Sequence, residues 1–447
     1  MKWTTLIFST FTVVALFANP HPREDLAPKD APRNIKSPLG TAVSQWDLLN
    51  YGVDVLRIQV DWSEKGELYQ LGPVVKEASG TPALIRRSVK KDPLGSYHGV
   101  LVDPATGWKM AFSSIGTGSE FRKLSRSMTF RFPIPSGTFQ FVLTAENPLT
   151  GQMEEVLRET IDPSQVVAAP KFLEKLDVRL LRQASVNPEL VMNIYAEGYP
   201  ESGRERFFED AQAAIDALEE NEFPGQDKLT FFGVFAPSNK ELGKAKNLGS
   251  QILERDSFLG LYFPYWNNFG RWYHVVYPTR QHKYRTALGQ LPYDYPLILV
   301  DSDDYWGVGN FNELTAIPAS NSSFTYLLLH EMGHFFGLNE EYESGGKTEL
   351  AFSPGIPEPW SQNITFLSRP DELKWKHLIQ NSTPVPTPSQ YWKGDGPYGA
   401  YRGGYAQTQP LGKSHKPGKS CVMNNGRDFC PICHHALKER FRFDLGL

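Results

Sequence analysis

The sequence predicts a multidomain α+β protein, in which an N-terminal β-sandwich precedes a mixed α/β domain. Three observations support this prediction. The chain has 447 residues, more than a single hydrophobic core usually supports. Its first half alternates apolar and polar residues with the two-residue period of β-strands. Its second half alternates apolar strand-like runs with amphipathic helical segments, as in mixed α/β domains.

The first residues have the pattern of a secretory signal peptide. Lys2 precedes an apolar run over residues 6–18, and this run is too short for a permanent membrane span. We therefore expect residues 1–18 to be a signal peptide and the mature protein to be secreted or periplasmic. We expect no membrane span in the remaining sequence, which has no apolar stretch of sufficient length.

The charge of the chain bears on whether it binds nucleic acid. The net charge is −4, and no block of the chain is rich in Lys and Arg. Proteins that bind nucleic acid usually carry a basic patch, so we expect no nucleic-acid partner.

Residues 40–165 are expected to form an accessory β-sandwich domain. Alternation with period two predicts strands over 53–60, 127–132 and 138–143, each with one buried face. Stretches rich in turn-forming residues separate these strands, for example 103–107. Metal-ligand and nucleophile-type residues do not cluster in this domain, so its expected role is folding support or substrate positioning.

A linker over 163–170 precedes the second domain, which we expect over 171–447. Apolar runs there predict three strands, and an amphipathic segment predicts a helix between the first two. The strands are expected over 191–195, 229–236 and 296–300, and the helix over 204–221.

The most informative motif is His330-Glu331-Met332-Gly333-His334. We expect it on a buried helix over 324–336, which Ser322 or Ser323 can begin as the N-cap. A step of four residues rotates a helix by about 400°, so the two histidines lie only ~40° apart. Both can then bind one Zn²⁺, and Glu331 is suited to be the general base that activates water. The motif therefore predicts a zinc metallopeptidase.

Zinc needs a third protein ligand, and the chain must turn back to supply it. On a continuous helix Glu340 would lie about 15 Å from His330 along the axis, too far to share its metal ion. Gly337 can adopt positive φ and end the helix, which returns Glu340 or Glu341 toward the histidines. We favour Glu340 as the ligand and keep Glu341 as the alternative.

The spacing His-x-x-x-His-x-x-Gly-x-x-Glu is similar to that of the metzincins, with an acidic residue in place of their third histidine. Metzincins also carry a methionine turn beneath the metal. Met423, within Ser420-Cys421-Val422-Met423-Asn424, is the candidate for this Met-turn.

The chain resembles the bacterial IgA-peptidase family of zinc metallopeptidases over residues 185–442. The resemblance rests on the zinc motif and on six further segments: Glu197-Gly198-Tyr199, Phe235-Ala236-Pro237-Ser238, Leu299-Val300-Asp301-Ser302, Tyr398-Gly399-Ala400-Tyr401, Cys421-Val422-Met423 and Phe429-Cys430-Pro431-Ile432-Cys433. Two departures affect the third ligand: the loop after His334 is one residue shorter, and Glu340 stands where the family has Asp.

This resemblance implies a metzincin-like catalytic domain with one catalytic zinc ion. It also implies endopeptidase chemistry on protein or glycoprotein substrates, without identifying immunoglobulin as the substrate. The alternative from another class is a non-catalytic glycoprotein- or glycan-binding protein that retains a peptidase-like fold. The intact His330, Glu331 and His334 favour the enzyme.

All three cysteines lie near the C-terminus, as Cys421, Cys430 and Cys433. In an exported protein we expect a disulfide from Cys421 to Cys430 or Cys433. The alternatives are a structural Cys₃His zinc site that uses His434 or His435, and reduced buried thiols. A second zinc ion is not the expected outcome.

Tyrosines in the Gly-rich loop before the Met-turn are candidates for a further catalytic role. Tyr401 or Tyr405 can donate a hydrogen bond to the oxyanion of a tetrahedral intermediate. The alternative is that both are ordinary loop aromatics.

Overall fold

The structure is a computed structural model of the whole chain, and it describes fourteen stretches of it. These are residues 41–42, 52–62, 68–116, 127–147, 150–185, 189–239, 242–245, 252–253, 257–263, 276–278, 281–342, 358–393, 396–404 and 414–447. The expected signal peptide and Tyr405 lie outside the described residues.

The N-terminal region contains two antiparallel sheets. One has the strand order β3-β2-β6 and the other β5-β4-β7-β8. Their strands are β2 (Val53–Trp62), β3 (Tyr69–Gly80), β4 (Tyr97–Val102), β5 (Lys109–Ile115), β6 (Ser127–Pro133), β7 (Phe139–Glu146) and β8 (Met153–Ile161). The strands predicted over 53–60, 127–132 and 138–143 are thus confirmed as β2, β6 and β7. The sheets pack face to face, since the ring of Phe141 lies 5.7 Å from that of Phe130 and 6.1 Å from that of Phe132.

A mixed seven-stranded sheet forms the centre of the second region, in the order β1-β9-β11-β10-β16-β18-β17. The strands are β1 (Thr41–Ala42), β9 (Asp177–Arg182), β10 (Leu190–Glu197), β11 (Leu229–Phe235), β16 (Tyr295–Val300), β17 (Val308–Asn310) and β18 (Leu314–Pro318). The three strands predicted here are confirmed as β10, β11 and β16. Every residue of these three is buried, as expected for parallel strands covered on both faces. β17 pairs antiparallel with β18 at one edge of the sheet.

Smaller elements complete the described chain. β12 (Gly243–Ala245), β13 (Ile252–Leu253), β14 (Leu261–Phe263) and β15 (Tyr277–Pro278) form a four-stranded sheet, and β19 (Tyr401–Arg402) pairs with β20 (His415–Lys416). The α-helices are α2 (Pro82–Ser88), α4 (Arg204–Glu220), α5 (Gln281–Leu288), α6 (Phe324–Phe335) and α7 (Pro431–Asp444). The short 3₁₀ helices are η1 (Pro163–Gln165), η2 (Leu173–Lys175), η3 (Glu201–Gly203), η4 (Gln226–Lys228), η6 (Lys376–Leu378), η7 (Ser389–Tyr391) and η8 (Val422–Asn424).

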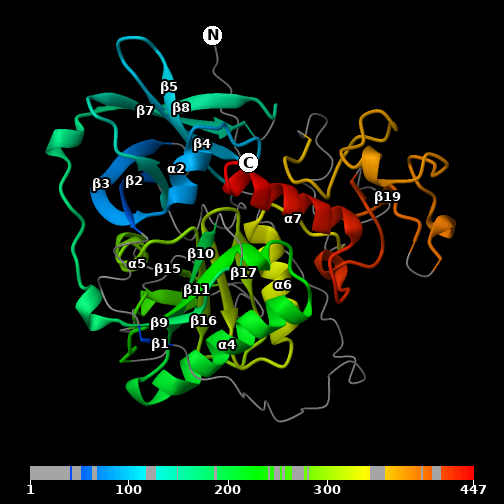
Figure 1. Cartoon of the computed structure of the whole chain (residues 1–447). Coiled ribbons are helices and arrows are strands. Elements are labelled where there is room, and N and C mark those ends of the chain that lie inside the picture. Colours follow the sequence, from blue (N-terminus) through cyan, green and yellow to red (C-terminus); the bar gives the residue numbers. More distant parts are fainter. Residues whose placement is uncertain are drawn as a thin grey trace, which may run out of the picture.

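Two hydrophobic cores lie on opposite faces of the mixed sheet. Leu297 and Leu299 of β16 face the core that α4 and α6 cover. Ile298 and Val300, which alternate with them, face a core shared with the two N-terminal sheets and α5. Figure 1 shows this arrangement, with the N-terminal sheets above the mixed sheet and α4 and α6 beside it. The N-terminal sheets are therefore part of the support on which the mixed sheet rests.

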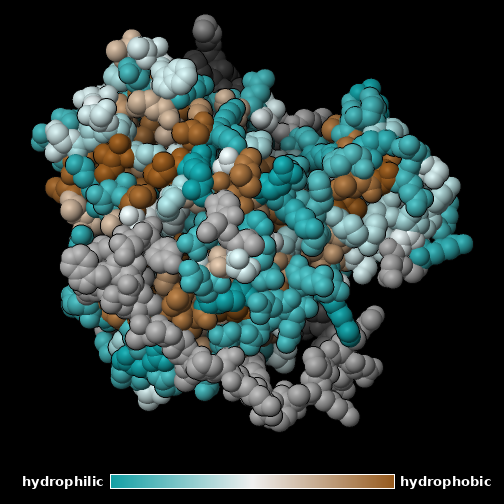
Figure 2. Space-filling model, in the orientation of Figure 1, coloured by the Kyte–Doolittle hydropathy of each residue, from teal (hydrophilic) through white to brown (hydrophobic). Residues whose placement is uncertain are grey.

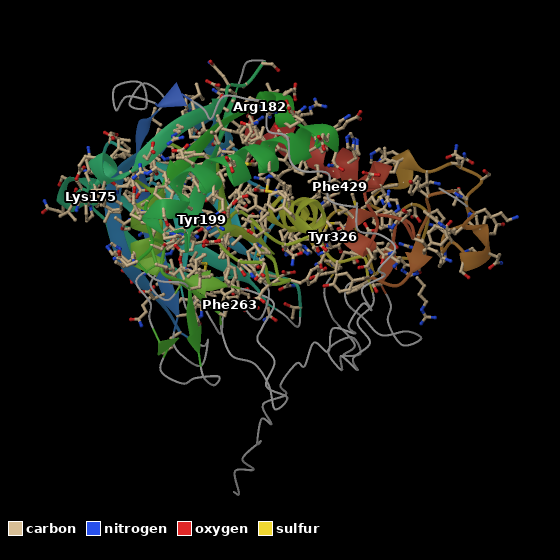
Figure 3. All side chains as sticks on the ribbon, turned by 90° about the horizontal axis from the view of Figure 1, so that it is seen from below. Lys175, Arg182, Tyr199, Phe263, Tyr326 and Phe429 are labelled. Atoms are coloured by element: carbon tan, nitrogen blue, oxygen red, sulfur yellow. The ribbon has the colours of Figure 1, made fainter. Side chains whose placement is uncertain are left out.

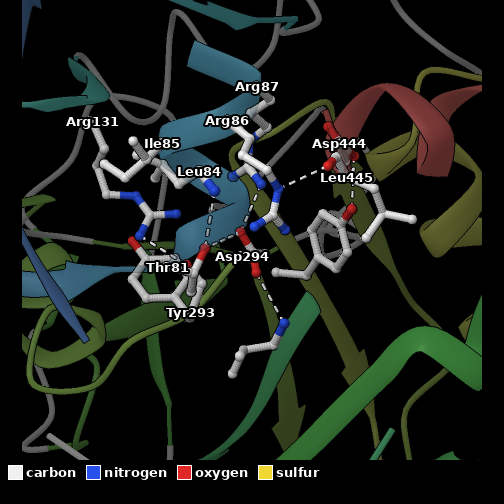
Figure 4. Close-up of polar contacts among 12 residues, drawn as sticks. Thr81, Leu84, Ile85, Arg86, Arg87, Arg131, Tyr293, Asp294, Asp444 and Leu445 are labelled. Atoms are coloured by element: carbon white, nitrogen blue, oxygen red, sulfur yellow. Dashed lines mark hydrogen bonds and ion pairs between the residues drawn. The ribbon is translucent and has the colours of Figure 1, made fainter. Parts of the chain in front are cut away.

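A polar network joins the N-terminal region to the mixed sheet around Asp294 (Figure 4). One carboxylate oxygen of Asp294 accepts hydrogen bonds from Thr81 Oγ1 at 2.6 Å and from Arg87 at 2.6 Å. Its other oxygen accepts from the backbone N–H of Val191, the second residue of β10, at 2.9 Å. One buried carboxylate thus connects the start of α2 to the central strand of the mixed sheet.

Most side chains on the face shown in Figure 2 are hydrophilic, and the hydrophobic ones lie in separate patches. Within the part of the chain that the structure describes, no helix combines the length and the apolar character of a membrane span.

Candidate metal centre

Helix α6 carries the histidine motif and begins and ends close to the predicted residues. Ser323 is its N-cap residue, as expected, but its side chain makes no capping hydrogen bond. Gly337 has φ +95°, and the N–H of Leu338 donates to the carbonyl of Gly333 at 2.9 Å. This is the hydrogen bond of a Schellman motif, which ends the helix and reverses the chain. Gly337 therefore returns the following loop toward the histidines.

The two histidines present their Nε2 atoms to the same point. Nδ1 of His330 lies 3.0 Å from the carbonyl oxygen of Val422, and Nδ1 of His334 lies 3.0 Å from that of Leu338. A carbonyl only accepts hydrogen bonds, so each Nδ1 carries the proton and each Nε2 a lone pair. The two Nε2 atoms are 3.1 Å apart. Tetrahedral zinc with Zn–N bonds of ~2.0–2.1 Å separates two nitrogen ligands by about 3.3 Å, so the pair fits one ion.

Glu340 and Glu341 are adjacent in sequence but face different surroundings. Oε1 of Glu340 lies 3.8 Å from Nε2 of His334. Glu341 is fully buried, and its Oε1 accepts hydrogen bonds from Asn363 and Cys433. The donors His330, His334 and Glu340 thus make up a His₂Glu set, a combination typical of catalytic zinc sites.

Glu331 lies directly beside this donor set, in a space that Gly307 leaves open. A Cβ atom at Gly307 would lie only 2.3 Å from Oε1 of Glu331. Burial raises the pKa of Glu331 to about 7, nearby His334 lowers it, and Glu340 raises it. A bound cation would lower this pKa. Burial chiefly, and then His334, lowers the pKa of His330 to about 3, which keeps it neutral and able to bind a metal.

Three tyrosines that the sequence reasoning did not single out surround this group. The His330 ring lies near the rings of Tyr326 and Tyr342, at centroid distances of 5.4 and 6.2 Å and interplanar angles of 25° and 22°. Burial first, and the charge of Glu331 in addition, raise the pKa of both Tyr305 and Tyr326. Tyr326 lies four residues before His330, so helical spacing was the one available signal for it.

Residues 178–396 match the family model of IgA Peptidase M64. This part of the chain is similar to the IgA peptidase M64 family. The resemblance inferred from the sequence is thereby confirmed. This similarity implies a metallopeptidase, with peptidase activity, a protein substrate and a metal ion. Among curated proteins, none matches the chain.

The matched range includes α6 and Glu340 but ends before Met423, so the position of Met423 is known from the structure alone. Met423 is fully buried in η8. A Cβ atom on Gly333, which lies between the two histidines, would be 2.5 Å from its Sδ atom. Figure 3 labels Tyr326 on α6 and Phe429 before α7, and the two segments lie side by side. Met423 therefore packs against the helix that carries the histidines, where a Met-turn is expected.

The structure gives Tyr401 a different partner from the one expected of a catalytic tyrosine. Its hydroxyl donates to the carbonyl oxygen of Pro397 at 2.6 Å, and its side chain packs against Trp392. Burial raises its pKa. Its hydroxyl is thus engaged within its own loop.

The expected disulfide is absent, because Cys421, Cys430 and Cys433 are all free and buried. The three cysteines nevertheless lie together, and they share their site with Glu341. His434 and His435, the expected histidine partners of a Cys₃His site, do not belong to this group, and His435 Nε2 lies 3.3 Å from His377 Nε2. Three free thiols beside one carboxylate differ from a disulfide, which would join only two of the sulfurs.

Proposed function

We propose that the chain is an exported zinc endopeptidase that hydrolyses peptide bonds in protein or glycoprotein substrates. The observation that carries this proposal is the convergence of two Nε2 lone pairs, 3.1 Å apart, with the Glu340 carboxylate on one side. Glu331 lies next to them, as hydrolysis by this chemistry requires.

His330, His334 and Glu340 are the residues that would hold the ion. When bound, zinc polarises the scissile carbonyl and lowers the pKa of water at the site. The carbonyl oxygens of Val422 and Leu338 orient the two imidazoles through Nδ1. Such outer partners fix the tautomer and ring orientation of a histidine ligand.

Glu331 acts as the general base and then as the general acid. A carboxylate oxygen of Glu331 takes one proton from water while the water oxygen bonds to the scissile carbonyl carbon. The resulting carboxylic acid then gives this proton to the amine nitrogen as the C–N bond breaks. Gly307 leaves the room in which the carboxylate lies.

The position of β17 at the edge of the sheet supports the proposal that the substrate binds as an extended peptide. It pairs with β18 on one side only among the described strands, and Gly309 brings it close to the backbone of Glu331. A substrate in extended conformation could pair with the outer edge of such a strand. This would bring a main-chain carbonyl close to Glu331.

Export is proposed from the N-terminal sequence, with residues 1–18 as signal peptide and a secreted or periplasmic product. Tyr405 remains a candidate for stabilising the oxyanion.

The test compares the wild-type chain with Glu331→Gln on an unbiased library of fluorescence-quenched peptides. We expect cleavage to disappear in the variant while its zinc content equals that of the wild type. Turnover by Glu331→Gln would contradict the general-base role. Zinc binding without any cleavage by the wild type would favour the non-catalytic glycoprotein- or glycan-binding alternative.

A further inference from the structure

A second group of metal-binding side chains lies next to the Met-turn, and peptide hydrolysis does not use it. It consists of Cys421, Cys430, Cys433 and Glu341, all of them buried. One ligand atom from each, three sulfurs and a carboxylate oxygen, lies within 4.8 Å of all the others. We call this group the Cys₃Glu cluster.

The cluster joins three segments that are distant in sequence. Glu341 follows the turn after α6, Cys421 precedes η8, and Cys430 and Cys433 lie at the start of α7. The N–H of Cys430 donates to Sγ of Cys421 at 3.4 Å, and the N–H of Cys433 donates to Sγ of Cys430 at 3.5 Å. Donors of this kind, at the N-terminus of a helix, stabilise negative charge on sulfur. Backbone N–H groups thus donate to the sulfurs of Cys421 and Cys430, where they would stabilise thiolates bound to a cation.

Among the four residues, Glu341 points most directly to a bound cation. Its side chain is completely buried. Oε1 accepts hydrogen bonds from Asn363 at 3.0 Å and from the Cys433 thiol at 2.9 Å, whereas Oε2 has no hydrogen-bond partner among the described residues. A buried carboxylate is costly unless it is paired or coordinates a metal. The nearby amine of Lys416 contacts the backbone carbonyl of Glu341.

We propose that the Cys₃Glu cluster holds a second, structural zinc ion, separate from the catalytic one. Four protein ligands make a closed tetrahedral site, which is the form of structural zinc sites. Bonds of ~2.3 Å to sulfur and ~2.0–2.2 Å to oxygen put neighbouring ligand atoms about 3.5–3.8 Å apart, within the observed limit. Thiolates select zinc over magnesium or calcium, and Cys430-x-x-Cys433 has a common zinc-ligand spacing.

The second ion would position parts of the catalytic centre. Glu341 directly follows the proposed ligand Glu340 in the chain, and the backbone N–H of Glu341 donates to the carbonyl of Met423 at 2.8 Å. Cys421 precedes Val422, whose carbonyl orients His330. The cluster therefore connects the loop of the third ligand, the Met-turn and α7. A disulfide between two of the sulfurs would remove two of the four ligands from the cluster.

The test measures metal in the purified full-length chain by inductively coupled plasma and native mass spectrometry. We expect two zinc ions per chain. Replacement by Co²⁺ should produce a thiolate-to-cobalt charge-transfer band in the near ultraviolet, which a His₂Glu site cannot produce. One ion per chain without this band, or a disulfide found in the unreduced protein, would overturn the proposal.

Variants assign each ion to its site. Cys433→Ser and Glu341→Gln should reduce the content from two ions to one or alter the cobalt band. The double variant His330→Ala/His334→Ala should also lose one ion but keep the band, and Glu331→Gln should keep both ions. Should the cluster variants fail to fold, the band in the wild-type chain decides. Failure of this proposal leaves the peptidase test intact, because that test measures cleavage.

Discussion

Replacing Gly307 by alanine should displace Glu331 while leaving the metal ligands in place. The added Cβ would lie 2.3 Å from Oε1 of Glu331 and 2.8 Å from its Cδ and Cγ. Ordinary contact begins at 3.4 Å, so the carboxylate must withdraw by about 1 Å. The strand is less free to move, because Trp306 is buried against Phe263 at 5.4 Å and β17 pairs with β18.

The expected effect on the rate follows from that displacement. A misplacement of 1 Å in a catalytic group can cost about 10²-fold in rate, which corresponds to about 2.7 kcal/mol of transition-state stabilisation. We therefore expect kcat/KM of Gly307→Ala to fall by about 10²-fold, with unchanged zinc content. Initial rates on the pooled quenched peptides, measured well below KM, give this ratio directly.

Two further chains control the measurement. Gly137→Ala introduces the same methyl group where no atom of the described residues lies within 4 Å, and its rate should equal that of the wild type. Glu331→Gln alone gives the lower limit of the rate, since cleavage is expected to disappear in that chain. Full activity of Gly307→Ala, or loss of its zinc, would refute the reasoning.

Three other predictions concern stability and are measured by denaturant unfolding. Gly333→Ala places a Cβ 2.5 Å from Sδ of Met423 and should lower the free energy of unfolding by about 1–3 kcal/mol through overpacking; no change would contradict the close contact. Asp294→Ala leaves Arg87 without its buried partner and should cost about 3–5 kcal/mol, whereas Asp54→Ala, at an exposed position, should be near neutral. Burial lowers the pKa of His98, so below its ordinary value of about 6.5 the unfolded chain binds a proton that the folded chain does not. Stability should therefore fall as pH decreases below that value, and His98→Gln should weaken this dependence; an identical pH profile would exclude His98 as the cause.

The sequence was informative wherever neighbouring residues determine the outcome. Period-two alternation and continuous apolar runs located β2, β10, β11 and β16, because burial of a strand face depends on local spacing. The helical motif predicted that His330 and His334 share one face. Gly337 was expected to end the helix, since its conformational freedom is a property of the residue itself.

By itself, therefore, the sequence determined the secondary structure around the motif, the family resemblance and the residues that could bind a metal. Only the tertiary structure separated Glu340, which lies beside His334, from Glu341, which lies 2.9 Å from the Cys433 thiol 92 positions away. Tertiary structure alone also brought Gly307 against Glu331 and the three cysteines to one carboxylate. Such contacts depend on how strands, helices and loops that are distant in sequence pack together. The spacing of neighbouring residues therefore does not predict them.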